Sequence, residues 1–296
     1  MSTPLSHRRA LLLMICAATL WSIAGVFTRH LDEVRGFEIT FWRSLFTALF
    51  VGLTLVFQQR SNFVSNVCKV GRIGILSAFM WGIMYSAFMM ALTMTTVANT
   101  LVVDSIAPFL TVIFAWLFLG QRTPLRTWLA ISLASVGILW MFAGSMAEFG
   151  TTHLAGMAVA LIVPIAAASN FVIFKKAGQS ADLIPTVMLG ALVSICLTLP
   201  LALPLQASLH DIGIMALLGV FQLGLPCMLL VRAAQTLSAP EISLLAMLEI
   251  VLGPLWAWMG AGEVPSTATL IGGAFVLVAL ALNELAMLRQ VRRLGR

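Results

Sequence analysis

Residues Val97 to Gln121 read VANTLVVDSIAPFLTVIFAWLFLGQ, and a related stretch, APEISLLAMLEIVLGPLWAWMGAGE, returns at Ala239 to Glu263. Both stretches are apolar, hold one internal carboxylate (Asp104, Glu249) and contain a proline near their middle. With a shift of 142 residues the identical positions include Leu110, Ala115, Trp116 and Gly120, which fall on Leu252, Ala257, Trp258 and Gly262. The chain therefore looks internally duplicated.

The composition around this repeat excludes a water-soluble globule. Hydrophobic residues make up 60% of the 296 positions, charged residues only 9%, and the mean hydropathy is +1.03. Soluble domains carry roughly 25% charged residues, so the solvent for most of this surface must be lipid. The net charge of +6 then indicates Lys and Arg kept in cytoplasmic loops, rather than a nucleic-acid partner.

Apolar runs long enough to cross a bilayer, about 20 residues each, occur ten times. They lie at about 10–29, 37–57, 73–92, 97–119, 127–146, 155–174, 183–204, 212–234, 241–261 and 267–287. The sequence thus predicts an all-α integral membrane protein with ten transmembrane helices and the lipid bilayer as its environment.

Charge placement predicts the orientation of these helices. With the N-terminus inside, fourteen of the seventeen Lys and Arg residues face the cytoplasm. Only Arg29 and Arg35 fall on the opposite side, and Arg43 lies within a helix. This bias favours a multi-pass protein of the cell inner membrane with both termini cytoplasmic.

Ten helices divide into two sets of five, residues 1–150 and 151–296. Because five is odd, the second set enters the bilayer with the opposite polarity, which gives two inverted repeats. Secondary transporters commonly have this architecture, with the substrate site at the interface of the repeats near mid-membrane.

Three charged residues fall inside predicted helices, where each costs roughly 2.5 to 3.5 kcal/mol on insertion scales. Arg43 and Asp104 each lie about seven residues from the outer start of their helix, so similar depths allow an ion pair. That pair either holds two helices in register or recognises charged substrate groups. Pro108 removes a backbone hydrogen bond one turn after Asp104, which favours a hinge in a cavity wall over an ordinary kink.

Glu249 lies near mid-depth of its helix without an obvious basic partner. A carboxyl group in hydrocarbon favours its neutral form, which suits either a proton-coupling residue or a structural Glu bonded to a carbonyl group. Pro254 lies five residues later and is a second candidate hinge.

The other candidates for substrate binding are mid-helix polar and aromatic residues. Trp81 and Tyr85 are four residues apart and share a helix face, so they predict an aromatic platform, with simple packing as the alternative. The remaining candidates are Trp21, Asn170 and Gln222, although the last two also suit interhelical hydrogen bonds.

The sequence lacks the motifs that would indicate an ATPase, a His-dependent hydrolase or a metal-binding protein. There is no P-loop motif, the four His residues lie at the terminus or in loops, and the four Cys residues lack metal-ligand spacing. We expect no enzymatic activity, no cofactor, no metal and no nucleic-acid partner.

These residues together resemble the drug/metabolite transporter superfamily, EamA type. The resemblance covers essentially the whole chain: Trp21, Phe41-Trp42-Arg43, Ala107-Pro108, Leu248-Glu249, and the two copies of Ala-Trp-x-x-x-Gly followed by Gln121 or Glu263. It departs at Gln121, where the family usually has Glu, and at Ile250, where proline usually follows the Glu. The resemblance implies two inverted five-helix repeats around a central cavity and export of amino acids or other small metabolites.

The sequence as a whole predicts a secondary active transporter that exports amino acids or similar small metabolites by alternating access. An uptake permease for small organic solutes and a non-transporting membrane scaffold stay open as alternatives. A monomer is plausible.

Overall fold

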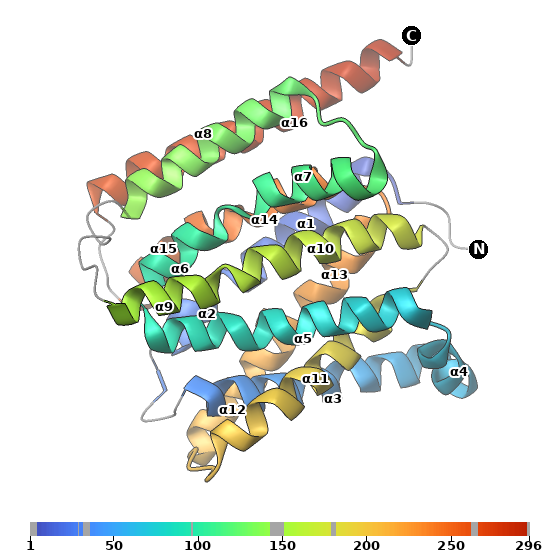
Figure 1. Ribbon diagram of the computed structural model, residues 1–296, viewed down its shortest axis with the longest axis vertical. Coiled ribbons are helices and arrows are strands. Elements are labelled where there is room, and N and C mark those ends of the chain that lie inside the picture. The colour runs from blue at the N-terminus through green and yellow to red at the C-terminus, as the bar shows by residue number, and fades with distance from the viewer. Residues whose placement is uncertain are drawn as a thin grey trace.

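The computed structural model describes residues 5–28, 30–31, 36–95, 97–142, 151–178, 182–261 and 266–294, and all regular structure in this described part is helical (Figure 1). The first part of the chain forms α1 (His7–Trp21), α2 (Ala24–Thr28), α3 (Gly36–Gln59), η1 (Arg60–Asn62), α4 (Phe63–Cys68), α5 (Gly71–Met94), α6 (Val97–Asp104), α7 (Ala107–Leu119) and α8 (Leu125–Phe142). The second part forms α9 (Thr151–Ala160), α10 (Ile162–Ala177), α11 (Ile184–Ala202), α12 (Leu209–Leu217), the π-helix η3 (Leu218–Gly224), α13 (Leu225–Ala234), α14 (Ala239–Ala246), α15 (Leu248–Ala261) and α16 (Thr267–Leu294).

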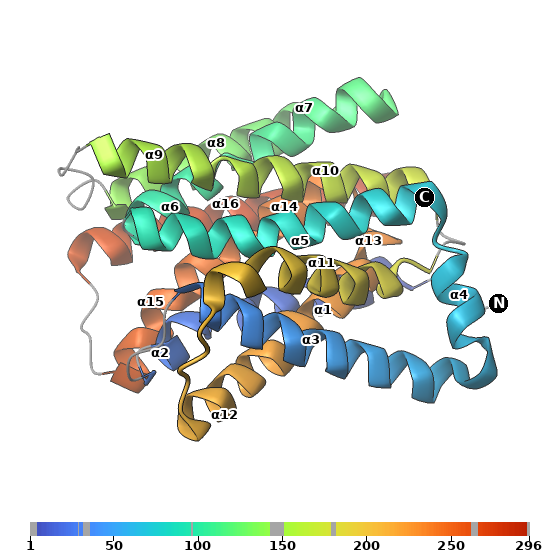
Figure 2. The same ribbon diagram turned by 60° about the horizontal axis from the view of Figure 1, so that its bottom comes forward.

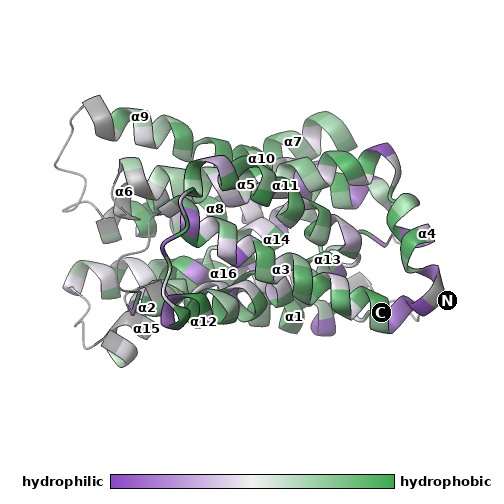
Figure 3. Cartoon of the chain, turned by 90° about the horizontal axis from the view of Figure 1, so that it is seen from below, coloured by the Kyte–Doolittle hydropathy of each residue, from purple (hydrophilic) through white to green (hydrophobic). Residues whose placement is uncertain are grey.

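The helices have the length and composition of a membrane protein. Eight segments of the described chain are long and apolar enough to cross a bilayer, and shorter apolar stretches lie at Leu125–Met141 and Thr267–Asn283. Most of the helical chain is hydrophobic (Figure 3), and many large apolar side chains are exposed, among them Phe57 at 77% and Met259 at 74%. An outer surface of this kind is stable only against lipid.

Several predicted continuous helices are broken in the structure. The first span breaks at Ser22 between α1 and α2, and the fourth breaks at Ser105 between α6 and α7. The sixth span breaks at Leu161, and the ninth breaks at Met247. Each break leaves backbone groups outside the regular helical ladder, which membranes tolerate only inside protein or beside a wet cavity.

The two candidate hinge prolines, Pro108 and Pro254, lie at different positions relative to these breaks. Pro108 lies in the first turn of α7, where its missing N–H needs no partner, and the chain turns just before it at Ser105 and Ile106. Pro254 lies inside α15, which runs on to Ala261. The break in this span comes earlier, at Met247.

The repeated Ala-Trp-x-x-x-Gly motif ends a helix in its first copy. Gly120 takes a left-handed conformation with φ 64°, and its N–H donates to the carbonyl of Trp116 at 3.1 Å. The N–H of Gln121 donates to the carbonyl of Ala115 at 3.2 Å. Gly is favoured at such a position because it has no Cβ. The matching Gly262 and Glu263, like Arg29 and Arg35, lie outside the described residues.

The helices pack in pairs that join the two parts of the chain. Helix α3 lies along α11, and α8 lies along α16 (Figures 1 and 2). Helix α1 packs on α13, whereas α10 packs on α5 and α7. Helix α1 begins and α16 ends at the same end of the bundle (Figure 1).

Several apolar side chains near the end where α1 begins are fully buried. Leu237, between α13 and α14, and Ile242 on α14 have no exposed surface, and Leu244 is 1% exposed. The hydroxyl of Thr236 donates to the carbonyl of Leu5 at 3.3 Å, which ties the start of α1 to this cluster.

Candidate functional site

A cavity of about 130 Å³ lies inside the bundle. An apolar cavity of roughly 150 Å³ accommodates a benzene-sized molecule, so this one has room for a small ring or a short chain. All seven residues predicted to bind substrate line it: Trp21, Arg43, Trp81, Tyr85, Asp104, Asn170 and Gln222. The coupling candidate Glu249 and the hinge candidate Pro108 line it too, whereas Pro254 does not.

Arg43 projects from α3 and is 5% exposed. Its Nη1 donates to Oε1 of Gln222 at 3.4 Å, and the Gln222 amide nitrogen lies 3.5 Å from the carbonyl oxygen of Trp21, at the end of α1. Within the described part of the chain, the carboxylate in electrostatic range of Arg43 is that of Glu249. Arg43 therefore bonds to Gln222 and not, as expected, to Asp104. The basic neighbour of Glu249, which the sequence did not reveal, is Arg43.

Close packing of η3 on α3 brings Gln222 to Arg43. A Cβ at Gly219 would lie 2.6 Å from the Arg43 carbonyl oxygen, so the two backbones meet only because this residue is glycine. Thr47 Oγ1 lies 2.8 Å from the carbonyl oxygens of both Arg43 and Gly219. The π-helical turn adds one residue per turn relative to an α-helix, and such turns are frequent at functional sites.

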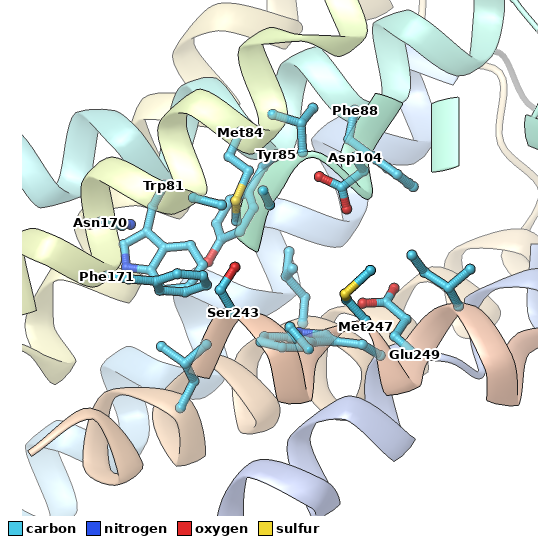
Figure 4. Close-up of a pocket in the computed structure, with 18 of the residues that line it drawn as sticks. Trp81, Met84, Tyr85, Phe88, Asp104, Asn170, Phe171, Ser243, Met247 and Glu249 are labelled. Carbon is cyan, nitrogen blue, oxygen red and sulfur yellow. The ribbon is translucent and has the colours of Figure 1, made fainter. Parts of the chain in front are cut away.

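Asp104 and Glu249 face each other across the cavity from opposite walls (Figure 4). Asp104 is the last residue of α6, and Glu249 is the second residue of α15, so each stands beside a helix break. The two carboxyl groups are in electrostatic range of each other. Two carboxylates that share a low-dielectric site repel each other, and a proton or an organic cation between them relieves this repulsion.

Aromatic side chains form one wall of the cavity. The rings of Trp81 and Tyr85 lie 5.4 Å apart with an interplanar angle of 32°, and Trp81 also lies 6.1 Å from the ring of Phe174. The Tyr85 hydroxyl donates to Sγ of Cys227 at 3.3 Å. The sequence predicted the pairing of Trp81 with Tyr85 from their spacing, but gave no signal for Cys227.

Asn170 enters the cavity from α10 and is 1% exposed. The Ser77 hydroxyl donates to its Oδ1 at 2.6 Å, which fixes the amide with its nitrogen toward the cavity. Ser243 on α14 also lines the cavity, and no pattern in the sequence distinguished it from the other buried serines. Within the described residues, no three His, Cys, Asp or Glu side chains gather closely enough to hold a metal ion.

Comparisons with known proteins agree with this architecture. The chain is 25% identical to human solute carrier family 35 member G1 over 284 residues, which cover 90% of this chain and 75% of the human protein. It is 23% identical to the pseudopaline exporter CntI of Pseudomonas aeruginosa over 281 residues, which cover 92% and 94% of the two chains. A crystal structure matches the fold with a TM-score of 0.82 at 17% identity, over 95% of this chain and 99% of the other.

The model of the EamA-like transporter family matches residues 8–143 and again residues 154–285. These two matches cover most of the chain, as the resemblance in the sequence implied. The family match and these relatives make the protein a multi-pass membrane transporter, and it belongs to the EamA-like transporter family.

Proposed function

We propose that the protein is a secondary active transporter that exports amino acids or similar small metabolites across the cell inner membrane. One observation carries this proposal: the internal charges, the polar side chains and the aromatic pair converge on a single cavity beside broken helices. A structural scaffold has no need for two carboxyl groups and a guanidinium in one desolvated space, where each is costly.

The proposed architecture has ten spans in two inverted repeats, residues 1–150 and 151–296. Reciprocal packing supports it. Helix α1 of the first span contacts α13 of the eighth span. In the same way, α10 of the sixth span contacts α5 of the third span. The pairs α3 with α11 and α8 with α16 each join corresponding spans of the two halves. Both termini are proposed to be cytoplasmic because most Lys and Arg residues then lie inside.

In this proposal the halves move by alternating access. The apolar cluster of Leu237, Ile242 and Leu244, which is buried in the described conformation, closes the cytoplasmic end. Export requires this cluster to part, so that solute enters the cavity from the cytoplasm, and then to close again. We propose that the protein works as a monomer.

In this proposal the charged residues have separate roles in solute binding and in proton coupling. Arg43, which is held by Gln222, attracts an anionic group of the solute, and Asp104 attracts a cationic group. Glu249 carries the coupling proton, because it is in range of both Arg43 and Asp104 and therefore responds to the charge of each. Trp21, Trp81 and Tyr85 supply apolar walls.

Counterflow in liposomes tests the proposal. Purified protein is reconstituted with unlabelled amino acids inside, and entry of the same labelled amino acids is measured over a broad panel that includes other small metabolites. A transporter accumulates at least one of them, whereas a scaffold accumulates none. Direction is tested separately, in cells with and without the protein: an exporter lowers the internal level of its solute and an uptake permease raises it.

A further inference from the structure

Four hydrogen-bond donors on residues that line the cavity have no partner among the described residues. They are Arg43 Nε, Trp81 Nε1, Asn170 Nδ2 and Ser243 Oγ. Arg43 is 5% exposed, and the other three residues are each 1% exposed. Buried polar groups are paired in the great majority of cases, because an unpaired donor bears the full cost of desolvation. Four such donors in one cavity indicate a ligand that supplies the acceptors.

Three of these donors gather at one end of the cavity. Figure 4 shows Trp81, Asn170 and Ser243 together at this end, on three different helices. Ser77, which holds the Asn170 amide, lies one turn before Trp81 on α5, so the same helix positions both groups. Asn170 and Trp81 are therefore fixed relative to each other before any solute enters.

The Ser243 hydroxyl, like that of Ser135 on α8, lacks the backbone bond that several other helical hydroxyl groups make. Ser86, Thr111 and Ser169 each donate to the carbonyl four residues earlier in their helix. Ser243 makes no such bond, although Ala239 lies at the same spacing. Its proton is therefore available to a group in the cavity.

The chemistry of these donors decides what this end can hold. An indole N–H and an amide NH₂ donate hydrogen bonds and offer no lone pair. An ammonium group, which only donates, finds no acceptor on them. A carboxylate offers about four acceptor positions and can accept from donors on more than one helix, and Arg43 supplies a positive charge to the same cavity.

The opposite end has the complementary chemistry. Asp104 and Glu249 face each other there and can accept hydrogen bonds from an ammonium group (Figure 4). Ser243 lies on α14 and Glu249 on α15, on either side of the break at Met247. Apolar side chains, among them Met84, Phe171 and Met247, also line the cavity.

We propose that Trp81, Asn170 and Ser243 form a carboxylate subsite, which binds the acid group of an amino-carboxylate solute while Asp104 and Glu249 receive an ammonium group several carbons away, as in lysine. This inference rests on the proposed transport function and adds the orientation of the solute to it. It assigns carboxylate recognition to three neutral side chains, whereas Arg43 contributes charge. Amines that lack the carboxylate leave all three donors unpaired and bind weakly.

Matched pairs of solutes test the subsite. Counterflow of labelled lysine, ornithine and 6-aminohexanoate is compared with that of cadaverine, putrescine and pentylamine, each of which lacks only the carboxylate. The wild-type protein is expected to favour the acid over its amine by about tenfold or more in KM, since hydrogen bonds to a charged group are the strong ones. Trp81→Phe, Asn170→Leu and Ser243→Ala are expected to reduce this preference, whereas Asp104→Asn weakens acid and amine alike.

Two controls separate recognition from structure. Trp140→Phe and Ser169→Ala change the same residue types at exposed positions outside the cavity, and they should keep the wild-type preference. The thermal midpoint of the solute-free Ser243→Ala protein should stay within about 1 °C of wild type, because the hydroxyl makes no bond to lose. A large drop in this midpoint would assign Ser243 a structural role and overturn its place in the subsite.

The remaining outcomes are equally decisive. Equal transport of acids and amines by the wild-type protein, or an unchanged preference in all three variants, would overturn the carboxylate subsite and leave the transport function standing. Failure to move any solute of the panel or of the broader metabolite set would instead overturn the proposed function, and the subsite with it.

Discussion

Arg43 on α3 donates a hydrogen bond to Gln222, 179 residues later in the chain, at 3.4 Å. The bond joins one part of the bundle to a π-helical turn in the other, inside the cavity. Gln222 in turn reaches toward the end of α1 through the Trp21 carbonyl. The guanidinium is thus held by a neutral partner, and its charge stays available to the solute and to Glu249.

We expect Arg43→Ala and Asp104→Asn to lower transport by about tenfold or more, because each removes a charge from the solute site. Both variants should still reach the membrane, since the apolar runs that direct insertion are unchanged. The measurement is counterflow per amount of reconstituted protein. Phe57→Leu, at a lipid-facing position 77% exposed, is the matched control and should transport like wild type. Wild-type transport by both charge variants would remove these residues from the site.

Glu249→Gln should abolish the pH dependence of transport. As pH rises, Glu249 releases its proton, the cavity gains a negative charge beside Asp104 and Arg43, and an ammonium group binds more tightly. The KM of the wild-type protein should therefore fall as pH rises, whereas that of the variant stays flat. Solute binding should persist in the variant because Asp104 is intact. A pH profile that is the same in both proteins would exclude Glu249 as the coupling residue.

Gly219→Val should destabilise the protein by about 1–3 kcal/mol, because its Cβ would overlap the Arg43 carbonyl and force α3 and η3 apart. The displaced Gln222 should also weaken transport. Gly213→Val on α12 is the control, since a Cβ there meets no atom within 4 Å. Thermal unfolding in detergent compares the two. Equal midpoints would show that the contact at Gly219 is not needed.

Glu38 makes a second connection across the bundle, which the sequence did not reveal. Its Oε1 accepts from the backbone N–H groups of Gln206 and Ala207 at 2.9 and 2.8 Å, and the side chain is 1% exposed. Glu38→Ala removes the acceptor of these two half-exposed N–H groups and should cost about 0.5–1.5 kcal/mol for each hydrogen bond lost. Asp182→Asn, which alters an exposed hydrogen bond to Gln59, should change the unfolding midpoint much less. Similar midpoints for the two variants would contradict this assignment.

The native Cys68 on α4 tests the orientation. Its exposed thiol should react with a membrane-impermeant maleimide in inside-out vesicles and stay unlabelled in intact spheroplasts, because α4 lies at the end of the bundle where α1 begins (Figure 1). A protein in which the other cysteines are replaced isolates this site. His210→Cys without Cys68 marks the opposite end and should give the reverse pattern. Labelling of Cys68 from outside would invert the proposed topology.

The sequence predicted the membrane segments and the residues of the cavity for a common reason. In a chain with so few polar groups, a charge or an amide inside an apolar run stands out, and burial in lipid forces such groups to turn inward. Arg43, Asp104, Asn170, Gln222 and Glu249 were found in this way.

The partners within the cavity were not predictable from helical spacing. Arg43 and Asp104 have similar expected depths, which suggested that they pair. In the structure, Gly219 lets η3 pack closely on α3, and this contact brings Gln222 rather than Asp104 to Arg43. The break at Met247 also left no sequence signal, since Pro254 suggested a later position. Ser243 was missed because a helical serine usually bonds to its own backbone, and only coordinates reveal that this one does not.

The count of charges in the cavity has a consequence for membrane potential. Two carboxyl groups and one guanidinium line it, so the site bears one negative charge in excess when both acids are ionised. One charge that crosses the full field exchanges about 2.3 kcal/mol per 100 mV. A return step with an empty, ionised site would therefore be driven or opposed by the voltage of the cell, and a bound proton would make that step electrically silent.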